Sequence, residues 1–447
     1  MINQKRAFSG YDGLDEALDF MRFGDIVVWQ VSSIDEYRFF AMPFVGRAQK
    51  ERKNIVYFRF GAHAPLVTQT DGIKVYDIAV KSGFESMVMT ISDIIEEEGR
   101  ETYYIFDSMT DLQEEWIADF MMGNFFVVTA PEVAKTNSVA YFSVQRNHHS
   151  VECMSRIRET ASVLIDVFKG ENETFIQPIK VQDRYLPTIF LPHRIDANDP
   201  ASIKPLTNGI ELARYYSLVG QSGNMDSTQN LDNWERFFLA KKGEAQHGGG
   251  TEGLRDLCRM VFGADEHILD IAMKNVTLTD LLDIKARMIG VGGIGGKATG
   301  MILSRKIIEK RLPEVAKILE PHDSFYICSN LYYTFLVRNR SWGLKIKQRK
   351  RRGYFTVAEI IKEKILEGRF SDPIREQFRR MLEYFGQSPI IVRSSSLLED
   401  GFGNAFAGKY ESVFCVNKGT LEERLLAFED AVRTVYASTM DESVLEY

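Results

Sequence analysis

The sequence predicts an α/β protein with three parts: a parallel-sheet domain, a helical connector and a smaller α+β domain. Its length of 447 residues corresponds to about three domains of roughly 150 residues each. Residues 1–195 alternate apolar runs with amphipathic stretches, which is typical of a helix-covered parallel sheet. Residues 196–280 are rich in polar, glycine-containing segments and short helical patterns, and residues 281–447 form a third unit.

The apolar runs of the first part predict strands, and the amphipathic stretches between them predict helices. The expected strands are Ile26–Val31, Ile55–Phe60, Tyr103–Phe106, Phe125–Thr129, Ala140–Val144, Thr174–Val181 and Thr188–Leu191. Two of the expected helices are Ile34–Gln49 and Phe84–Glu98.

The connector and the third part are expected to be mainly helical. In the connector we expect loops at Asn224–Asn230 and Gly243–Gly253 and helices at Leu231–Lys241, Leu254–Phe262 and Thr279–Met288. The third part has strand-like runs at Phe325–Ser329 and Ile390–Val392, a basic loop at Lys345–Arg352 and helices at Thr356–Leu366 and Ile374–Phe385. A final helix begins with a capping box made by Thr420 and Glu423.

Composition excludes several classes of protein. With 45% hydrophobic residues and only 12 Pro, the chain is neither disordered nor fibrous. No apolar run approaches the ~18 residues of a membrane span, and the first residues lack the apolar core of a signal peptide. The four cysteines form no CxxC pair, so we expect a cytoplasmic protein without a disulfide framework or zinc site.

Charge is unevenly distributed along the chain. The net charge is −7, and residues 281–447 hold 27 Lys+Arg against 21 Asp+Glu, which gives +6 and leaves −13 for residues 1–280. A basic segment attached to an acidic one is consistent with anion binding in the basic part, and uneven surface decoration is the alternative.

A glycine cluster opens the third part. Residues 290–303 read GVGGIGGKATGMIL, so that Gly295, Gly296 and Lys297 begin a helix. Glycine lets backbone N–H groups approach an anion, and a helix start favours negative charge. The preceding residues, LLDIKARMI, indicate helix and not strand, which argues against a dinucleotide-binding turn. A flexible helix-entry turn without a ligand is the alternative.

The second chemical segment follows a short apolar strand. Residues 389–412 read PIIVRSSSLLEDGFGNAFAGKYES, which delivers Arg393 to the carboxyl end of the strand. Arginine clamps phosphate oxygens with parallel hydrogen bonds, and Ser394 and Ser395 add hydroxyl donors. A strand end whose arginine pairs with Glu399 or Asp400 is the alternative.

These two segments together resemble the amino-terminal nucleotide-binding domain of the pyruvate phosphate dikinase and phosphoenolpyruvate synthase family, which has an ATP-grasp-type fold. The matching motifs are GGK at 295–297, VRSSSLLED at 392–400 and FAG at 406–408. The resemblance implies that Lys297 and Arg393 are catalytic residues that contact ATP phosphates. It also implies that Gly295, Gly296, Ser394 and Ser395 bind ATP, and that a covering loop consists of Gly408, Lys409, Tyr410, Glu411 and Ser412.

The same resemblance implies an ATP- and Mg²⁺-dependent kinase that phosphorylates a carrier histidine and then pyruvate, giving phosphoenolpyruvate. By this resemblance, we expect the adenine pocket, most Mg²⁺ ligands, the carrier histidine and the pyruvate site in regions beyond this sequence. We therefore expect the front portion of a longer phosphotransferase, inactive by itself, with no metal ligands among its own residues. A non-catalytic nucleotide-sensing or partner-binding protein is the alternative, and the phosphoryl acceptor is left open.

The first part resembles a RecA-like NTPase domain that has lost ATP hydrolysis. GDIVVWQV at 24–31 is similar to the first strand of such domains, and Asp107 stands where their Mg²⁺ ligand would be. The loop Ser32–Tyr37 contains no Gly or Lys, and its carboxylates would repel phosphate. We expect partner contact, self-association or regulation through this part, with a plain Rossmann-like sheet as the alternative.

Two further features are not expected to form a catalytic or binding site. The run KIKQRKRRGY at 345–354 lacks aromatic interleaving and predicts a solvated loop that draws in ATP by its charge, not a nucleic-acid site. Adjacent residues point in different directions, so His148 and His149 are expected in a surface loop.

Overall fold

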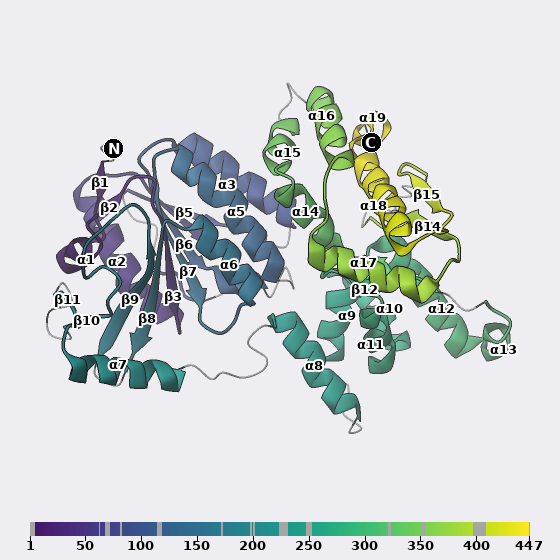
Figure 1. Ribbon diagram of the computed structural model, residues 1–447, viewed down its shortest axis with the longest axis horizontal. Coiled ribbons are helices and arrows are strands. Elements are labelled where there is room, and N and C mark those ends of the chain that lie inside the picture. The colour runs from purple at the N-terminus through teal and green to yellow at the C-terminus, as the bar shows by residue number, and fades with distance from the viewer. Residues whose placement is uncertain are drawn as a thin grey trace. The chain divides into compact units, whose positions relative to one another are not determined.

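The computed structural model describes residues 5–446 apart from residues 62, 68–71, 81–82, 114–118, 171–172, 197–198, 200–201, 223–230, 247–252, 321–322, 350–353 and 397–407. The chain divides into two compact units, Met1–Arg236 and Phe237–Tyr447 (Figure 1). The boundary lies within helix α8 (Asn233–Gln246), inside the stretch that the sequence indicates as a connector.

Unit 1 is built on a large mixed sheet. Among its described residues the strand order is β11-β10-β9-β8-β3-β7-β6-β4-β5. The strands from β8 to β5 in this order are parallel to their neighbours, and β9, β10 and β11 add an antiparallel edge. The bounds are β3 Ile26–Val31, β4 Ile55–Arg59, β5 Ile73–Asp77, β6 Tyr103–Ser108, β7 Val139–Gln145, β8 Val163–Lys169, β9 Thr174–Val181, β10 His193–Ile195 and β11 Ile203–Pro205; β1 (Arg6–Ala7) and β2 (Met21–Arg22) form a separate pair.

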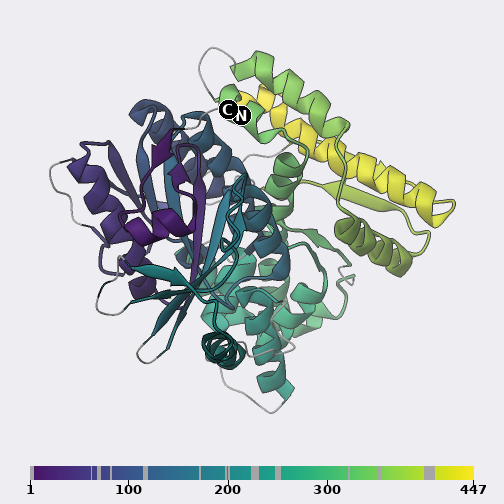
Figure 2. The ribbon, with the colours of Figure 1, turned by 60° about the vertical axis from the view of Figure 1, so that its left-hand side comes forward.

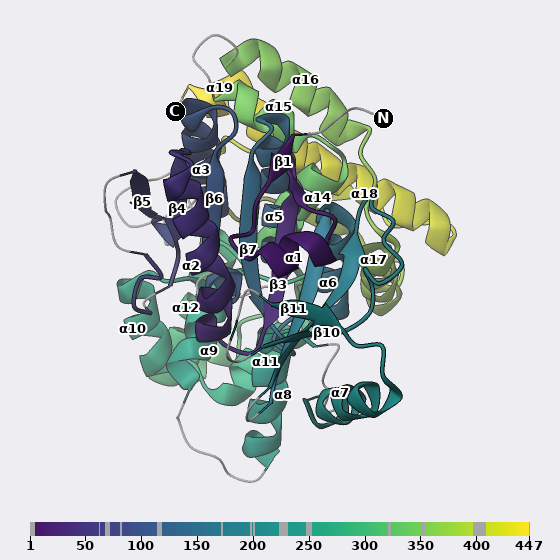
Figure 3. The same ribbon diagram turned by 90° about the vertical axis from the view of Figure 1, so that its left-hand side faces the viewer.

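Helices cover both faces of this sheet. On one face lie α1 (Asp12–Ala17) and α2 (Ile34–Lys50), which stand in front of the strands in Figure 3. On the other lie α3 (Phe84–Glu98), α5 (Asp119–Lys135) and α6 (Val151–Thr160) (Figure 1). Helix α7 (Gly209–Ser222) packs Tyr215 against Phe168 and Phe175 at the antiparallel edge. A short 3-10 turn, η2 (Met109–Asp111), follows β6.

The alternation of side chains along the strands explains the two helix layers. On the α2 side, Trp29 stacks on Phe40 and Tyr141 stacks on Phe44, with ring centroids 4.0 and 3.9 Å apart. Neighbouring strand residues point to the opposite face, where Phe142 packs against Phe126 of α5. Both faces are therefore buried, as the apolar strands of the sequence predict.

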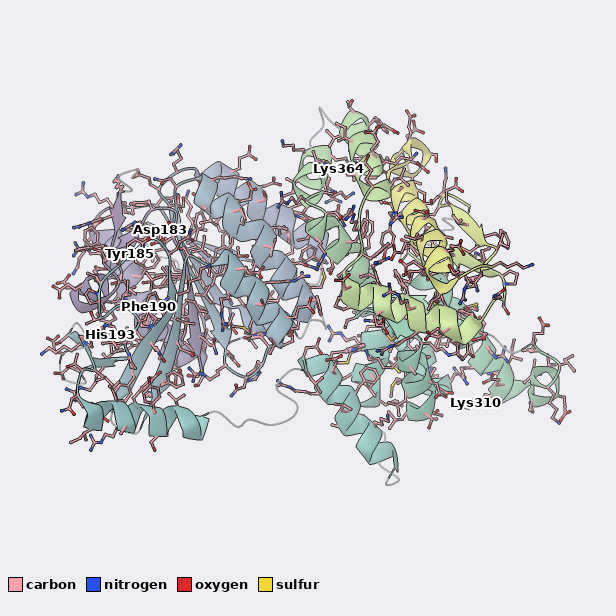
Figure 4. All side chains as sticks on the ribbon, in the orientation of Figure 1. Asp183, Tyr185, Phe190, His193, Lys310 and Lys364 are labelled. Carbon is pink, nitrogen blue, oxygen red and sulfur yellow. The ribbon has the colours of Figure 1, made fainter. Side chains whose placement is uncertain are left out.

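Several strands of unit 1 differ from the sequence prediction. Phe125–Thr129, expected to be a strand, lies inside α5, because a short apolar run does not distinguish a buried helix from a strand. Thr188–Leu191 forms turns instead of a strand. Figure 4 labels Tyr185 and Phe190 in this connection between β9 and β10, where both side chains are exposed. Strands β5, β8, β10 and β11 were not anticipated.

Unit 2 is mainly helical, with two small sheets among its described residues. Its elements after α8 are α9 (Leu254–Phe262), α10 (Glu266–Asn275), α11 (Leu278–Ala286), β12 (Met288–Ile289), α12 (Gly296–Arg311), α13 (Pro313–Ala316), β13 (Tyr326–Ile327), α14 (Ser329–Arg338), α15 (Trp342–Gln348), α16 (Tyr354–Leu366), α17 (Asp372–Phe385), β14 (Ile390–Arg393), β15 (Ser412–Cys415), α18 (Leu421–Ala437), η3 (Ser438–Met440) and α19 (Glu442–Leu445). Strands β12 and β13 are parallel, and β14 and β15 are antiparallel.

Helix α18 organises the last part of unit 2. It lies along the β14–β15 pair and packs against α16 and α17 (Figure 2). Phe428 of α18 meets Phe378 of α17 edge-on. The predicted capping box is present, because the Thr420 hydroxyl accepts from Glu423 N while the Glu423 carboxylate accepts from Thr420 N.

Two expectations for unit 2 need correction. The segment before the glycine cluster is not helical throughout, since α11 ends at Ala286 and Met288–Ile289 forms the short strand β12. The predicted basic loop begins as helix α15, in which Lys345 is only 8% exposed and donates to the Gln348 side chain at 3.4 Å. Within the part of the chain that the structure describes, no helix is long and apolar enough to span a membrane.

Candidate functional site

The glycine cluster forms the turn between β12 and α12. Gly290, Gly292 and Gly295 all have positive φ angles, of 76°, 113° and 80°. Gly295 is the N-cap of α12, and a Cβ atom placed on it would lie 1.4 Å from the carbonyl oxygen of Ser395. Only glycine allows both this backbone conformation and this close approach. The glycine therefore lets a second segment lie directly against the helix start.

That second segment is the end of β14, which carries Arg393 and Ser394–Ser396. Strand β14 is held by β15, with Arg393 opposite Ser412. The Arg393 side chain is exposed, and within the described residues it makes no side-chain hydrogen bond or ion pair. The strand thus delivers a guanidinium group to its carboxyl end, as the sequence predicts.

Two hydrogen bonds join these two segments. Gly296 N donates to the Ser396 carbonyl oxygen at 3.1 Å, and Ala298 N donates to the Ser395 hydroxyl at 2.9 Å. Lys297 lies between these two amide donors and is partly exposed. The glycine segment and the arginine segment, remote in sequence, therefore share one place in the fold.

The same hydrogen bonds change the expected role of the helix start. The sequence suggests backbone N–H groups that are open to an anion, but the amides of Gly296 and Ala298 donate to Ser396 and Ser395. These two amides are therefore not open to an anion, and the positive end of the α12 dipole still favours negative charge at this place.

The predicted covering loop is anchored to the end of the chain. Gly408 has φ 74°. Lys409 Nζ donates to the Ser443 carbonyl oxygen at 3.3 Å, and Glu411 N donates to the Ser438 hydroxyl at 3.2 Å. Ser412 begins β15, and Tyr410, partly buried, precedes it. Residues 397–407, which contain Glu399, Asp400, Phe406 and Ala407 of the predicted motifs, lie outside the described residues.

Three residues beside the glycine turn were not anticipated. Gln377 of α17 accepts from Gly290 N at 3.0 Å. A Cβ atom on Gly292 would lie 2.8 Å from the Asn330 side chain, whose Nδ2 is buried and has no partner among the described residues. Thr299 of α12 is also buried, and its hydroxyl has no hydrogen-bond partner among the described residues. These residues come from α14, α17 and the helix interior, so spacing along the sequence gave no signal for them.

In unit 1 the loop expected to hold phosphate in RecA-like domains binds one of its own carboxylates. Ser33 caps α2, accepting from Glu36 N at 3.4 Å, and the Glu36 carboxylate accepts from Ser32 N at 2.7 Å. The carboxylate takes a main-chain amide at the helix start, where an anion would otherwise be stabilised.

Asp107 is likewise fully engaged. It is completely buried, and its carboxylate accepts hydrogen bonds from Phe60 N and the Tyr57 hydroxyl, both at 2.9 Å. His63 Nε2 lies 3.2 Å from the same carboxylate, and this neighbouring carboxylate raises the pKa of His63 although burial opposes it. Asp107 therefore organises the end of β6 through protein contacts.

Of the two predicted surface histidines, His148 is exposed in a loop as expected, and His149 is not. His149 is buried, with 6% of its surface exposed, and lies beside Asp119 of α5 and Cys153 of α6. One ligand atom from each of these three residues lies within 4.8 Å of the other two. Among the described residues, this is the one group of at least three His, Cys, Asp or Glu side chains that is close enough to hold a metal ion.

Part of unit 2 is similar to a known protein family. Residues 291–447 match the family model described as pyruvate phosphate dikinase, AMP/ATP-binding domain. The match begins in the glycine cluster and includes Lys297, Arg393 and the predicted covering loop. No curated protein matches the chain. The matched region thus resembles the nucleotide-binding part of a phosphotransferase, and the match does not extend to unit 1.

Proposed function

We propose that residues 281–447 form the first half of an ATP-grasp-type domain that binds ATP, with the triphosphate between the Lys297 ammonium and the Arg393 guanidinium. Gly295, Gly296, Ser394 and Ser395 line this site. Residues 408–412, from Gly408 to Ser412, cover the phosphates. The observation that carries the proposal is the pair of hydrogen bonds from Gly296 and Ala298 to the serines that follow Arg393.

The chemistry of phosphoryl transfer fits these side chains. Its transition state spreads negative charge over phosphate oxygens, so that positioned cations supply most of the catalytic effect. Arg393 offers a planar fork of donors, and Lys297 offers a compact charge on a flexible stem. Together they neutralise and orient the transferred phosphoryl group.

Mg²⁺ accompanies ATP in such reactions, where it bridges phosphate oxygens. Among the described residues of unit 2, no group of three His, Cys, Asp or Glu side chains is close enough to hold a metal ion. Mg²⁺ is usually held by one or two carboxylates together with the phosphates of the nucleotide, and we propose that most of its protein ligands come from the second half of the domain.

The chain as a whole is proposed to be the front portion of a phosphotransferase of the pyruvate phosphate dikinase or phosphoenolpyruvate synthase type. In the intact enzyme ATP phosphorylates a carrier histidine, and the phosphoryl group then passes to pyruvate. By itself the chain binds nucleotide and does not turn over. The family match at residues 291–447 supports the nucleotide-binding step, and the later steps rest on the resemblance alone.

Unit 1 is proposed to be a RecA-like domain without ATP hydrolysis. The contact between Glu36 and Ser32 N and the hydrogen bonds received by Asp107 support this loss, because both groups are occupied by protein partners. These observations favour the second candidate function, a non-catalytic protein in which unit 1 contacts a partner and unit 2 senses nucleotide. We also propose that the chain has three domains, at residues 1–195, 196–280 and 281–447.

Product analysis distinguishes the two candidates. The natural reading frame that contains this chain is expressed and supplied with ATP, Mg²⁺ and pyruvate. The enzyme proposal predicts AMP formation that depends on pyruvate. ADP as the sole product, independent of pyruvate, contradicts it, and ATP binding without any turnover in the complete natural protein supports the sensing function instead.

A further inference from the structure

A buried cluster of metal-binding side chains joins α5 to α6 in unit 1. Asp119 opens α5, His149 stands directly before the N-cap of α6, and Cys153 lies in the first turn of α6. Their side chains are almost completely inaccessible to solvent. The spacing His-x-x-x-Cys brings an imidazole and a thiol to one side of the α6 start, and packing of α5 on α6 adds the carboxylate.

The His149 ring is oriented by bonds on both nitrogens. Its Nε2 lies 2.8 Å from the Thr110 hydroxyl, which also accepts from Gln145 N at 2.9 Å. Its Nδ1 lies 3.0 Å from Asp119 Oδ1. Histidines that ligate metals usually engage their other ring nitrogen in this way, which fixes the ring orientation. Nδ1 is therefore the nitrogen that faces the Asp119 carboxylate.

The hydrogen bonds around Nδ1 cannot all be satisfied. Gln113 Nε2 lies 2.7 Å from Nδ1, 2.9 Å from Asp119 Oδ1 and 3.2 Å from the His148 carbonyl oxygen. If Nδ1 carries a proton, that N–H faces the N–H donors of Gln113. If Nδ1 is unprotonated, its lone pair faces the Asp119 carboxylate. If the Gln113 amide is rotated, its oxygen faces two other oxygen acceptors. Each neutral arrangement leaves one repulsive contact in a buried place.

A cation between Nδ1 and Oδ1 removes this conflict. The Nδ1 lone pair then points at the cation, and the Gln113 amide keeps its two oxygen acceptors. Asp119 Oδ2 accepts from Ser150 N at 2.6 Å, which holds the carboxylate in place. Cys153 adds a sulfur ligand after its thiol proton leaves to solvent, so one proton is released for each metal bound.

We propose that Asp119 Oδ1, His149 Nδ1 and Cys153 Sγ bind a divalent transition metal of the zinc class. Thiolate and imidazole ligands favour zinc over magnesium or calcium. Bonds of about 2.0–2.3 Å to a tetrahedral zinc ion place ligand atoms about 3.3–3.7 Å apart, and the three candidate ligand atoms lie within 4.8 Å of one another. A water molecule completes the coordination. Because the ligands are buried, the metal's role is to fasten α5 to α6, independently of the nucleotide site.

Metal titration of the whole chain tests this site. The chain is dialysed against a chelator and titrated with Zn²⁺ and, as a spectroscopic probe, with Co²⁺. We expect one metal per chain, a higher melting temperature with Zn²⁺, and a thiolate-to-cobalt absorption band in the near ultraviolet. The Cys153→Ser, His149→Gln and Asp119→Asn variants are each expected to lose at least tenfold in metal affinity.

Cys258→Ser is the matched control, because Cys258 is also a buried cysteine but lies in α9 of unit 2. This substitution is expected to leave the metal content unchanged. Equal metal content in wild type and Cys153→Ser would overturn the proposal. If Cys153→Ser fails to fold, the wild-type spectrum decides: a folded wild-type chain that takes up Co²⁺ without a thiolate band, or takes up no metal, refutes the site.

Discussion

The hydroxyl of Ser395 accepts a hydrogen bond from the main-chain amide of Ala298 at 2.9 Å, across 97 residues of sequence. This bond ties the end of β14 to the first turn of α12, and with it the segment of Arg393 to the segment of Lys297. Protein oxygens therefore occupy two amides at the helix start, those of Gly296 and Ala298, which are not open to an anion.

Substitution of Gly295 is expected to separate these segments. In Gly295→Ala the new Cβ would lie 1.4 Å from the Ser395 carbonyl oxygen. The backbone, at φ 80° and ψ 169°, is in a region that is almost exclusive to glycine. We expect a loss of about 1–3 kcal/mol in the unfolding free energy of unit 2 from backbone strain alone, together with weaker ATP binding, measured by urea denaturation and calorimetry.

Gly300→Ala is the matched control, because Gly300 lies in the same helix with open space around its Cα. Alanine in a helix interior is favoured over glycine by about 1 kcal/mol, so this variant is expected to gain stability. A Gly295→Ala chain as stable as wild type, with unchanged ATP affinity, would show that the two segments do not depend on their close contact.

Much of the fold followed from local patterns. Strands β3 and β9 and helices α3 and α9 have the bounds that the sequence predicts. The failures have physical causes. The run Phe125–Thr129 lies in the buried helix α5 and is almost entirely apolar. Its hydrophobic periodicity therefore could not distinguish a helix from a strand. Lys345 lies in helix α15 and is buried. The high charge of its segment instead predicted a solvent-exposed loop.

The candidate site could be predicted only in part. The glycine turn and Arg393 carry recognisable motifs, and the residues named for the phosphate site stay predictions. That Ser395 and Ser396 occupy the amides of α12 depends on a long-range contact, for which spacing has no signal. The burial of His149 beside Asp119 and Cys153 likewise arises from the packing of α5 on α6, not from any local motif.

The capping box of α18 predicts a measurable loss of stability in unit 2. Thr420→Ala removes the side-chain acceptor for Glu423 N. We expect it to lower the unfolding free energy by about 1 kcal/mol, measured by denaturation. Thr434→Ala serves as the control, because Thr434 lies inside the same helix and, among the described residues, its hydroxyl bonds only the Asp430 carbonyl oxygen. Equal stability of both variants would argue against a stabilising cap.

A buried carboxyl group in α1 predicts a pH dependence of stability. Burial raises the pKa of Asp15 to about 6, although hydrogen bonds from Ser9 oppose the shift. Its protonated form is favoured in the folded state, so the stability that it contributes is complete below about pH 4 and is lost as pH rises to about 6. The full shift corresponds to at most about 3 kcal/mol.

Asp15→Asn is expected to remove this component of the pH dependence. Denaturant unfolding of wild type and variant at pH 4 and pH 7 measures it, and the variant is expected to lose less stability between the two. Glu16→Gln, a change of an exposed carboxylate in the same helix, is expected to behave like wild type. Identical pH profiles of Asp15→Asn and wild type would exclude the assignment.

The most direct test of the nucleotide site compares the affinities for ATP and AMP, measured by calorimetry, in wild type and in the Lys297→Ala and Arg393→Ala variants. Since charge-assisted hydrogen bonds contribute about 1.5–3 kcal/mol, each variant is expected to bind ATP about 10- to 100-fold more weakly, with a smaller change for AMP. Lys310→Ala, at the exposed far end of α12 (Figure 4), is expected to bind both as wild type does. Unchanged ATP affinity in both site variants would contradict a triphosphate held between these two cations.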